Sequence, residues 1–379
     1  MKILYDHQAF DMQRYGGVSN CFVQLISNLP KGVEYEISLH ECGNIHLGNS
    51  RLVDTKPKIQ FPENFILNRH FKGQTILYDW YSKTFPSKTP DGRNRLYSIS
   101  KLSQGDYDVF HPTFFNPYFL PYLNGKPFVL TVHDMIPELF YSKNHFQVKV
   151  KPLLCKKAAR IIAVSNKTKE DLVNLLHVPE EKVTVIYHGA PNFDDISLKP
   201  IFDGRYILYV GQRDRYKSFL PMLKSLLPVL QRYQDIKVVC TGPSFTRTEA
   251  LFIKEVGLFN KIIHLQANDI ELQNLYAHAL CFIYPSVYEG FGIPILEAYS
   301  ANCPVLLNYA SCFPEIAQDA ALYFHLDDNS SDLDVIMESF LQMSEYEREA
   351  LLNKQRQRLA YFSWQKSARE LANIYVSLL

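Results

Sequence analysis

Two glutamates flank a glycine-rich segment in the sequence YEGFGIPILEA, residues 288–298. Pro294 suits the first turn of a helix, where its missing N–H removes no hydrogen bond, and the residues after it continue a helix. Gly290 and Gly292 let a ligand approach the backbone closely. Because free N–H groups and the positive end of the helix dipole coincide at a helix start, the segment predicts a phosphate-binding loop. A plain turn, with Glu297 as a partner of the helix dipole, explains the same residues.

The two carboxylates suit hydroxyl groups better than they suit phosphate. Glu289 is expected at the mouth of the loop and Glu297 about one turn into the helix, so each can contact a different part of one ligand. Carboxylates accept hydrogen bonds from sugar hydroxyls, whereas next to phosphate they require intervening cations. The segment therefore predicts recognition of a sugar and an anionic group together.

The required cations occur in YVGQRDRYKSF, residues 209–219, directly after a predicted strand. Arg213 and Lys217 stand four positions apart, where a guanidinium and an ammonium could hold a diphosphate; Arg215 is a competing candidate. Solvated loop cations are the alternative interpretation. The ligand-binding interpretation gains weight because open α/β sheets place ligands at the carboxyl ends of their strands.

A second possible anion cradle lies near the amino terminus, in KILYDHQAFDMQRYGGVSNCFVQLISNL, residues 2–29. The segment predicts a strand, a loop, the pair Gly16 and Gly17, and an amphipathic helix from about Val18. The glycine pair alone is a weak signal. Neither the GxGxxG signature of dinucleotide sites nor a Walker loop occurs in the chain.

Histidines follow several predicted strands. His133 ends an apolar strand in TVHDMIPE, residues 131–138, and His111 and His188 follow two others. Such a histidine can donate to a sugar hydroxyl or a phosphate oxygen, although a structural role explains a lone histidine as well. No spacing of histidines and acids matches a metal site, so we predict no catalytic metal. Nucleophilic catalysis is not favoured, since there is no GxSxG elbow.

The elements that must position these residues follow an α/β pattern. Short apolar runs alternate with helix-period segments, as in parallel sheets covered by helices. The predicted strands are 2–5, 128–132, 161–165 and 183–187, then 206–210, 236–240, 262–265, 281–285 and 304–308. Residues 188–204, rich in Pro, Gly and Asp, predict a linker between two α/β domains that form a cleft.

One part of the first half departs from this order. Residues 41–105 predict an irregular insertion, within which the aromatic and basic stretch 76–96 is either solvated or a patch for an acceptor or a membrane surface.

Composition narrows the class of protein. A length of 379 residues exceeds what one core organises, and 47% hydrophobic residues suffice for two. The 40 Lys and Arg nearly balance the 39 Asp and Glu, which argues against a nucleic-acid-binding surface. Seven scattered cysteines without a CxxC pair predict reduced thiols in a cytoplasmic protein. We expect neither a signal peptide nor a membrane span.

The motifs together resemble the retaining glycosyltransferases of family 4. The likeness rests on GGVSN near the start, HD after an inner strand, VGQRDRYKSF, and EGFGIPILE with its two glutamates. It implies the GT-B architecture, in which two Rossmann-like α/β domains with parallel sheets face each other across a cleft. The implied domains are 1–195 on the acceptor side, 196–360 for the nucleotide sugar, and a final helix, 361–379, that crosses back to the first domain.

The resemblance also implies roles in the second domain. Arg213 and Lys217 would bind the donor diphosphate. Glu289 would accept from the transferred sugar and Glu297 from the ribose. The remaining implied donor contacts are made by backbone groups: Phe291 and Gly292 to sugar or phosphate, and Gln266 and Ile270 to the base.

In the first domain the resemblance assigns three residues. Gly16 and Gly17 would approach the diphosphate, and His133 would touch the sugar near its reacting face. Two positions depart from the family pattern: His188 stands where many relatives carry asparagine, and a serine follows Lys217 where a glycine is common.

The expected reaction is retaining transfer of a hexose from a nucleotide diphosphate sugar to an acceptor hydroxyl, without metal or other cofactor. By resemblance the leaving phosphate takes the acceptor proton. We expect GDP-mannose as donor, with UDP-glucose or UDP-N-acetylglucosamine as alternatives, and a saccharide or lipid-linked saccharide of a bacterial surface polymer as acceptor.

Some alternatives stay open. A sugar-nucleotide epimerase, a phosphorylase-like protein or a non-catalytic GT-B subunit would share the fold. The basic stretch 142–160 could contact an anionic membrane at its cytoplasmic face or only water. No nucleic-acid partner is expected, and the oligomeric state is open.

Overall fold

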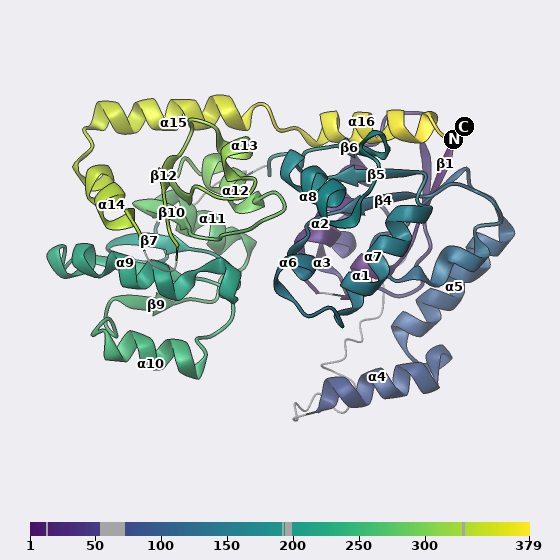
Figure 1. Cartoon of the computed structure of the whole chain (residues 1–379), viewed down its shortest axis with the longest axis horizontal. Coiled ribbons are helices and arrows are strands. Elements are labelled where there is room, and N and C mark those ends of the chain that lie inside the picture. The colour runs from purple at the N-terminus through teal and green to yellow at the C-terminus, as the bar shows by residue number, and fades with distance from the viewer. Residues whose placement is uncertain (13, 54–72, 192, 194–198, 328–329) are drawn as a thin grey trace. The chain divides into compact units, whose positions relative to one another are not determined.

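The structure is a computed structural model that describes residues 1–12, 14–53, 73–191, 193, 199–327 and 330–379 (Figure 1). It comprises two compact units: unit 1 is Met1–Gly189 with Trp364–Leu379, and unit 2 is Ala190–Ser363. The sequence places the corresponding borders after residues 195 and 360. Part of the predicted linker, residues 192 and 194–198, lies outside the described residues.

Unit 1 is built on parallel strands. The first sheet has the order β2-β1-β3 and the second β4-β5-β6, and a parallel bridge between Phe110 and Phe128 joins β3 to β4. The strands are β1 (Lys2–Tyr5), β2 (Glu34–Ile37), β3 (Val109–His111), β4 (Val129–Val132), β5 (Arg160–Ala163) and β6 (Val183–Val185). All of β4 is buried, as expected for a parallel strand covered on both faces.

Helices cover these sheets. They are α1 (Gln8–Met12), α2 (Gly17–Ser27), α3 (Ile45–Asn49), α4 (Gln74–Thr84), α5 (Pro90–Gln104), α6 (Ile136–Phe140), α7 (Phe146–Lys157), α8 (Asn166–Leu176) and α16 (Trp364–Val376), with 3-10 turns at Pro86–Lys88, Pro117–Tyr122 and Glu180–Lys182. The final helix, α16, packs on α2, and Figure 1 shows the two chain ends close together. A buried hydrogen bond of 2.8 Å between the hydroxyls of Tyr5 and Tyr375 also joins α16 to β1.

The prediction of an irregular insertion over 41–105 is wrong for its described parts. Two helices, α4 and α5, occupy 74–84 and 90–104. Pro90 starts α5, and Gly105 closes it in the left-handed conformation at φ 72°. Residues 54–72 of the same stretch lie outside the described residues.

Unit 2 contains one six-stranded parallel sheet with the order β12-β11-β10-β7-β8-β9. Its strands are β7 (Arg205–Tyr209), β8 (Ile236–Cys240), β9 (Ile262–His264), β10 (Cys281–Tyr284), β11 (Val305–Asn308) and β12 (Leu322–Phe324). Its helices are α9 (Phe219–Arg232), α10 (Arg247–Glu255), α11 (Asp269–His278), α12 (Ile293–Ser300), α13 (Phe313–Ala317), α14 (Leu333–Gln342) and α15 (Glu345–Leu359), with a 3-10 turn at Arg215–Lys217. The strand order reverses at β7 and β10, the position where such sheets bind ligands.

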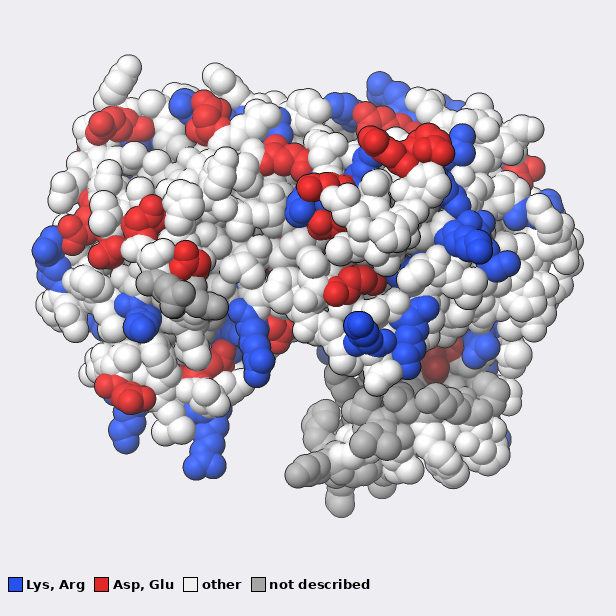
Figure 2. Space-filling view, viewed as in Figure 1, with Lys and Arg blue, Asp and Glu red and all other residues white. Residues whose placement is uncertain are grey.

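The predicted α/β fold class is thus confirmed in both units. All seven cysteines are buried free thiols within the described parts of the chain. Among the described helices, none combines the length and the apolar character needed to cross a bilayer. Figure 2 shows basic and acidic side chains intermixed over the face in view, in keeping with the near balance of charges.

Candidate functional site

The loops after β7 and β10 meet in unit 2. These strands are parallel neighbours, so their carboxyl ends lie at one edge of the sheet. Lys217 closes the 3-10 turn after β7, and its Nζ lies 2.5 Å from Oε1 of Glu289 in the loop after β10. A backbone hydrogen bond of 2.8 Å, from the N–H of Val287 to the carbonyl of Tyr216, joins the same loops. The structure therefore brings together one predicted cation and one predicted acid.

This ion pair is largely shielded from water. The side chains of Lys217 and Glu289 are 15% and 10% exposed. The ammonium also lies 5.1 Å from the ring centre of Tyr216 and 5.8 Å from that of Tyr284. Partial burial strengthens the attraction between the charges, and it would strengthen the attraction of Lys217 to a bound phosphate in the same way.

The helix predicted at Pro294 is present as α12. Gly292 is its N-terminal cap, at φ 87°, a conformation that favours glycine. A Cβ at this position would lie 3.2 Å from side-chain atoms of both Ile295 and Phe313. The ring of Phe291 is buried edge-on against Phe362, with ring centres 5.7 Å apart. Gly292 thus permits the sharp entry of the chain into the helix beside Glu289.

Glu297 lies one turn into α12, as expected. Its Oε2 accepts a hydrogen bond of 3.0 Å from the hydroxyl of Tyr276, on α11. Burial raises the pKa of the Glu297 carboxyl to about 7. Since the residue is only partly shielded, the carboxyl can reach a ligand hydroxyl, and near neutral pH it can accept or donate.

The two residues assigned to base binding lie beyond β9. Gln266 is exposed in the loop, and Ile270 is 72% exposed in the first turn of α11. The loop ends in a capping box: Asn268 accepts from the N–H of Glu271, and the Glu271 carboxylate accepts from the N–H of Asn268. The cap fixes the backbone between the two assigned residues.

Arg213 does not pair with Lys217 around an open site. Its side chain is 4% exposed, and Nε donates to Oε1 of Glu249 at 2.9 Å. Nη2 donates to the carbonyl oxygens of Pro243 and Ser244, the second at 2.9 Å. The guanidinium also lies over the rings of Phe219 and Phe245, 5.5 and 4.9 Å from their centres.

This environment makes Arg213 a brace between the loop after β7 and the start of α10. Only its Nη1 lacks a hydrogen-bond partner among the described residues, and that atom is buried. The spacing of Arg213 and Lys217 could not indicate this, because the charge partner, Glu249, lies in a different segment.

The glycine pair of unit 1 starts a helix, as predicted. Gly16 caps α2 in an extended conformation, and Gly17 is its first residue. The Ser19 hydroxyl donates to the carbonyl of Gly16 at 2.9 Å. Gly17 is exposed, so its backbone can be approached.

His133 lies directly after β4 beside a second histidine. Its ring stacks on that of His188, with centres 5.9 Å apart and planes 18° from parallel. Burial lowers the pKa of His133 to about 4, with Lys151 adding to the effect. His133 is therefore neutral near pH 7, and its Nε2 has no hydrogen-bond partner among the described residues.

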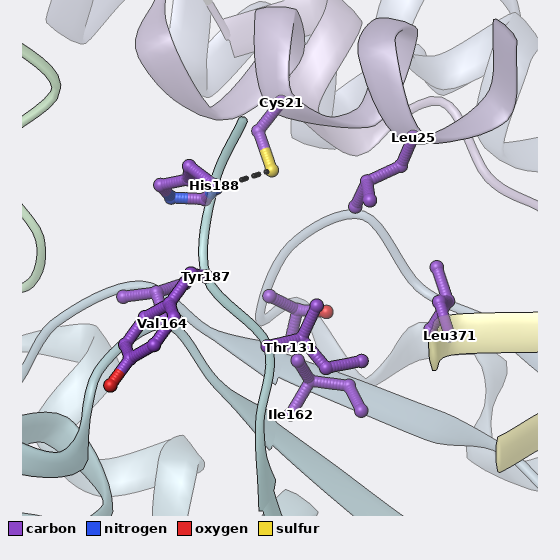
Figure 3. Close-up of a pocket in the computed structure, with 9 residues that line it drawn as sticks. Cys21, Leu25, Thr131, Ile162, Val164, Tyr187, His188 and Leu371 are labelled. Atoms are coloured by element: carbon purple, nitrogen blue, oxygen red, sulfur yellow. Dashed lines mark hydrogen bonds between the residues drawn. The ribbon is translucent and has the colours of Figure 1, made fainter. Parts of the chain in front are cut away.

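The other two histidines differ in role. His188 Nδ1 lies 3.3 Å from Sγ of Cys21, a contact drawn in Figure 3. His111 is fully buried between the hydroxyls of Tyr375, at 2.5 Å, and Thr131, at 2.9 Å, so it belongs to the core. The part played by Cys21 could not be found from the sequence, since it shares no spacing pattern with either of its histidine neighbours.

In the comparison with known proteins, a glycosyltransferase family model matches each of the two units. The family model "Glycosyltransferase Family 4" matches residues 15–191, and "Glycosyl transferases group 1" matches residues 195–358. The chain is 30% identical over 217 residues to the O-antigen chain mannosyltransferase RfbU of Salmonella typhimurium, a match that covers 56% of this chain and 60% of the relative. It is 28% identical over 390 residues to O-antigen chain mannosyltransferase B of Escherichia coli, with 95% of each covered.

A solved structure shares the fold over the full length. The Anabaena protein HepE, in complex with UDP and glucose, superposes with a TM-score of 0.71 over 100% of both chains at 16% identity. This likeness shows the GT-B architecture expected from the sequence.

Proposed function

Since the chain belongs to the group 1 glycosyl transferases, with a family 4 amino-terminal region, we propose that it transfers mannose from GDP-mannose, with retention, to a saccharide or lipid-linked saccharide in bacterial surface polysaccharide synthesis. The names of two curated relatives, both O-antigen chain mannosyltransferases, support the sugar and the polymer. UDP-glucose and UDP-N-acetylglucosamine are the competing donors.

The observation that carries the proposal is the pair of Lys217 and Glu289 beside the start of α12. Negative charge grows on the leaving diphosphate as the glycosidic bond breaks. An ammonium and a helix N-terminus fixed near that charge stabilise the transition state more than the ground state. In the proposal Lys217 faces the diphosphate, and Glu289 turns to the sugar hydroxyls.

The other assigned residues complete the donor site in this proposal. Glu297 accepts from the ribose, and the backbone at Gln266 and Ile270 meets the base. Arg213 acts mainly by holding the loop that carries Lys217, because its guanidinium already has protein partners.

In the same proposal, backbone N–H groups of Gly16 and Gly17 approach the diphosphate, and those of Phe291 and Gly292 donate to sugar or phosphate. His133 contacts the sugar near the reacting carbon. Its low pKa suits a neutral hydrogen-bond partner. The leaving phosphate takes the acceptor proton, and no metal takes part.

A donor panel tests the function. The purified protein is mixed with GDP-mannose, UDP-glucose or UDP-N-acetylglucosamine, and binding, slow hydrolysis and transfer to a lipid-linked oligosaccharide are measured. We expect GDP-mannose to bind most tightly and to release GDP. An epimerase would change the sugar nucleotide without releasing nucleotide, a phosphorylase would need inorganic phosphate, and a non-catalytic subunit would bind no donor.

The role of Lys217 is tested by Lys217→Met, with Lys254→Met, an exposed lysine on α10, as matched control. Loss of one transition-state donor typically lowers kcat by about 10² to 10³. We expect that loss for Lys217→Met and wild-type turnover for the control. Equal turnover in both variants would contradict the assignment.

We further propose that a surface on α6 and α7 meets an anionic membrane. Five large apolar side chains are 42 to 48% exposed there: Leu139, Phe140, Tyr141, Phe146 and Leu153. Exposed lysines lie among them: Lys143, Lys149, Lys156 and Lys157. Aromatic side chains that enter the interface and lysines that meet anionic head groups are the two features of peripheral binding.

Lys151 is not part of this surface, although it lies in the same basic stretch. Its side chain is fully buried, and its Nζ pairs with Oε2 of Glu138 at 2.7 Å. Only some of the lysines in the predicted basic stretch are therefore exposed to solvent.

Co-sedimentation with phosphatidylglycerol and with phosphatidylcholine vesicles tests the membrane contact. We expect binding to the anionic vesicles, which Phe146→Ser and Lys149→Ser weaken. Equal recovery with both lipids would sink the proposal.

A further inference from the structure

Three potential metal ligands meet in unit 1, from distant parts of the chain. Cys21 lies on α2, His133 follows β4 and His188 follows β6. One ligand atom from each lies within 4.8 Å of the other two. No spacing in the sequence predicts this cluster, because only the folding of the parallel strands brings the residues together.

The distances suit one small cation. Sγ of Cys21 and Nδ1 of His188 are 3.3 Å apart. With Zn–S bonds of about 2.3 Å and Zn–N bonds of about 2.0 Å, a tetrahedral ion separates such ligands by about 3.5 Å. The first two ligands therefore fit within a few tenths of an ångström, whereas the His133 ligand atom, which lies within 4.8 Å of both, would have to move closer by up to roughly 1.5 Å.

Burial acts on the three side chains in opposite directions. It lowers the pKa of His133 to about 4 and that of His188 to about 3, which favours the neutral imidazole that binds a metal, and it raises the pKa of the Cys21 thiol, so the ion itself must displace the thiol proton. Figure 3 shows the Cys21 thiol directed toward the His188 ring. Cys21 and His188 are 1% and 6% exposed, and His133 is partly exposed.

We propose that Cys21, His133 and His188 bind one Zn²⁺ ion, with water as the fourth ligand. A thiolate and two imidazoles match the preference of zinc, whereas magnesium and calcium require oxygen ligands. On binding, the Zn–S bond forms, the S–H bond breaks, and the thiol proton leaves to solvent. The three ligands include no carboxylate, so the bound ion keeps a net positive charge.

The charges around the cluster permit a cation. Lys151 is the cation whose charge affects His133. Its ammonium is held 2.7 Å from Oε2 of Glu138 and 3.0 Å from the carbonyl of Asp134, so these oxygens offset its repulsion.

Zinc at this site would inhibit transfer. This consequence rests on the proposed function, in which His133 contacts the donor sugar, because the imidazole cannot bind zinc and the sugar with the same nitrogen. Zinc binding itself does not depend on that function, so the two claims can be tested separately.

Cobalt gives a test of binding without any activity assay. The full-length protein, stripped with chelator, is titrated with Co²⁺ alone. We expect one equivalent to produce a near-ultraviolet thiolate-to-cobalt absorption with the intense visible bands of a tetrahedral ion, and Zn²⁺ to abolish both. Absence of the thiolate absorption in the wild-type protein would overturn the proposal.

Two variants locate the site. Cys21→Ser should remove the thiolate absorption, and His133→Gln should weaken the apparent affinity at least about tenfold while the absorption persists at high cobalt. The matched control is Cys42→Ser, another buried cysteine of unit 1, whose Sγ contacts the backbone of Asn44. Retention of the absorption in Cys21→Ser, or its loss in Cys42→Ser, would refute the assignment, and circular dichroism checks the fold of each variant.

The inhibitory effect is measured last, with the donor identified by the panel. Micromolar Zn²⁺ should lower turnover of the wild type and of Cys42→Ser, and excess chelator should restore it. Cys21→Ser should be resistant. If cobalt binds as expected but zinc leaves turnover unchanged, the metal site stands and the role of His133 at the sugar falls.

Discussion

Replacing Arg213 with methionine should destabilise unit 2, because the guanidinium compensates a buried carboxylate. Its Nε lies 2.9 Å from Oε1 of Glu249, and the two side chains are 4% and 8% exposed. The second oxygen of Glu249 accepts from the N–H of Thr246 at 2.6 Å, in the capping box of α10. Methionine fills the space between Phe219 and Phe245 but leaves the carboxylate without its cation.

The expected loss follows from that geometry. Removing one partner of a buried ion pair costs about 3 to 5 kcal/mol, since the remaining charge stays buried and unpaired. For a domain of this size, 1 kcal/mol shifts Tm by about 2 to 4 °C. Arg213→Met should therefore lower the Tm of unit 2 by about 6 to 20 °C.

Thermal and urea unfolding measure the effect. The double variant Arg213→Met with Glu249→Gln should recover part of the loss, because the glutamine carries no charge. Arg232→Met is the control: this arginine is 63% exposed in its pair with Glu338, and exposed pairs contribute less than about 1 kcal/mol.

One result would refute the reasoning. If Arg213→Met melts within about 2 °C of the wild type while transfer falls by about 10² or more, the guanidinium binds the donor and does not brace the loop.

Three further outcomes are expected. Burial raises the pKa of Glu297 to about 7 in the folded chain, so the folded state binds the proton more tightly than the unfolded chain does, and stability falls as pH rises from about 4.5 to 7. The free energy of unfolding of Glu297→Gln, minus that of the wild type, should therefore increase by about 1 to 3 kcal/mol between pH 5 and pH 8. A constant difference would contradict this. Gly292→Ala should lower stability by about 1 to 2 kcal/mol, measured by urea unfolding, because alanine is strained at φ 87° and its Cβ would crowd Ile295. Gly189→Ala should cost about 1 to 3 kcal/mol, since its Cβ would overlap the backbone nitrogen and the ring of Trp364. Gly48→Ala, whose Cβ would meet no neighbour outside its own helix within 4 Å, should not destabilise. Similar melting of the two variants would show that Trp364 moves freely.

The regular strands were predictable because they are apolar runs between clear breaks. For example, β8 was predicted at 236–240 and is observed at Ile236–Cys240. Three strands are missing from the predicted ranges: β2, β3 and β12. The first alternates acidic and apolar residues, and the other two have three residues each. Short or half-exposed strands carry little periodicity, so only their partners in the sheet define them.

The site was predictable in its residue types but not in its pairings. Helix α12 and its glycine cap follow from local sequence, since proline and glycine act within one turn. The partners of Lys217 and Arg213 are Glu289 and Glu249, 72 and 36 residues away. Which cation meets which acid depends on the order of β7, β8 and β10 in the sheet, and spacing along the chain does not contain that order.

Under the proposed function, the pairing of Lys217 with Glu289 gives the two glutamates different roles. In the structure, Glu289 lies 2.5 Å from Lys217 and offsets its charge. A diphosphate brings its own negative charges to the ammonium, so Lys217 can exchange one anionic partner for another without becoming unpaired at either stage. On this proposal Glu289 would then be released to accept hydroxyls of the sugar that the same donor carries. Donor binding and the orientation of the sugar would be coupled through one ion pair, whereas Glu297, held by Tyr276 farther along α12, would serve the nucleoside independently.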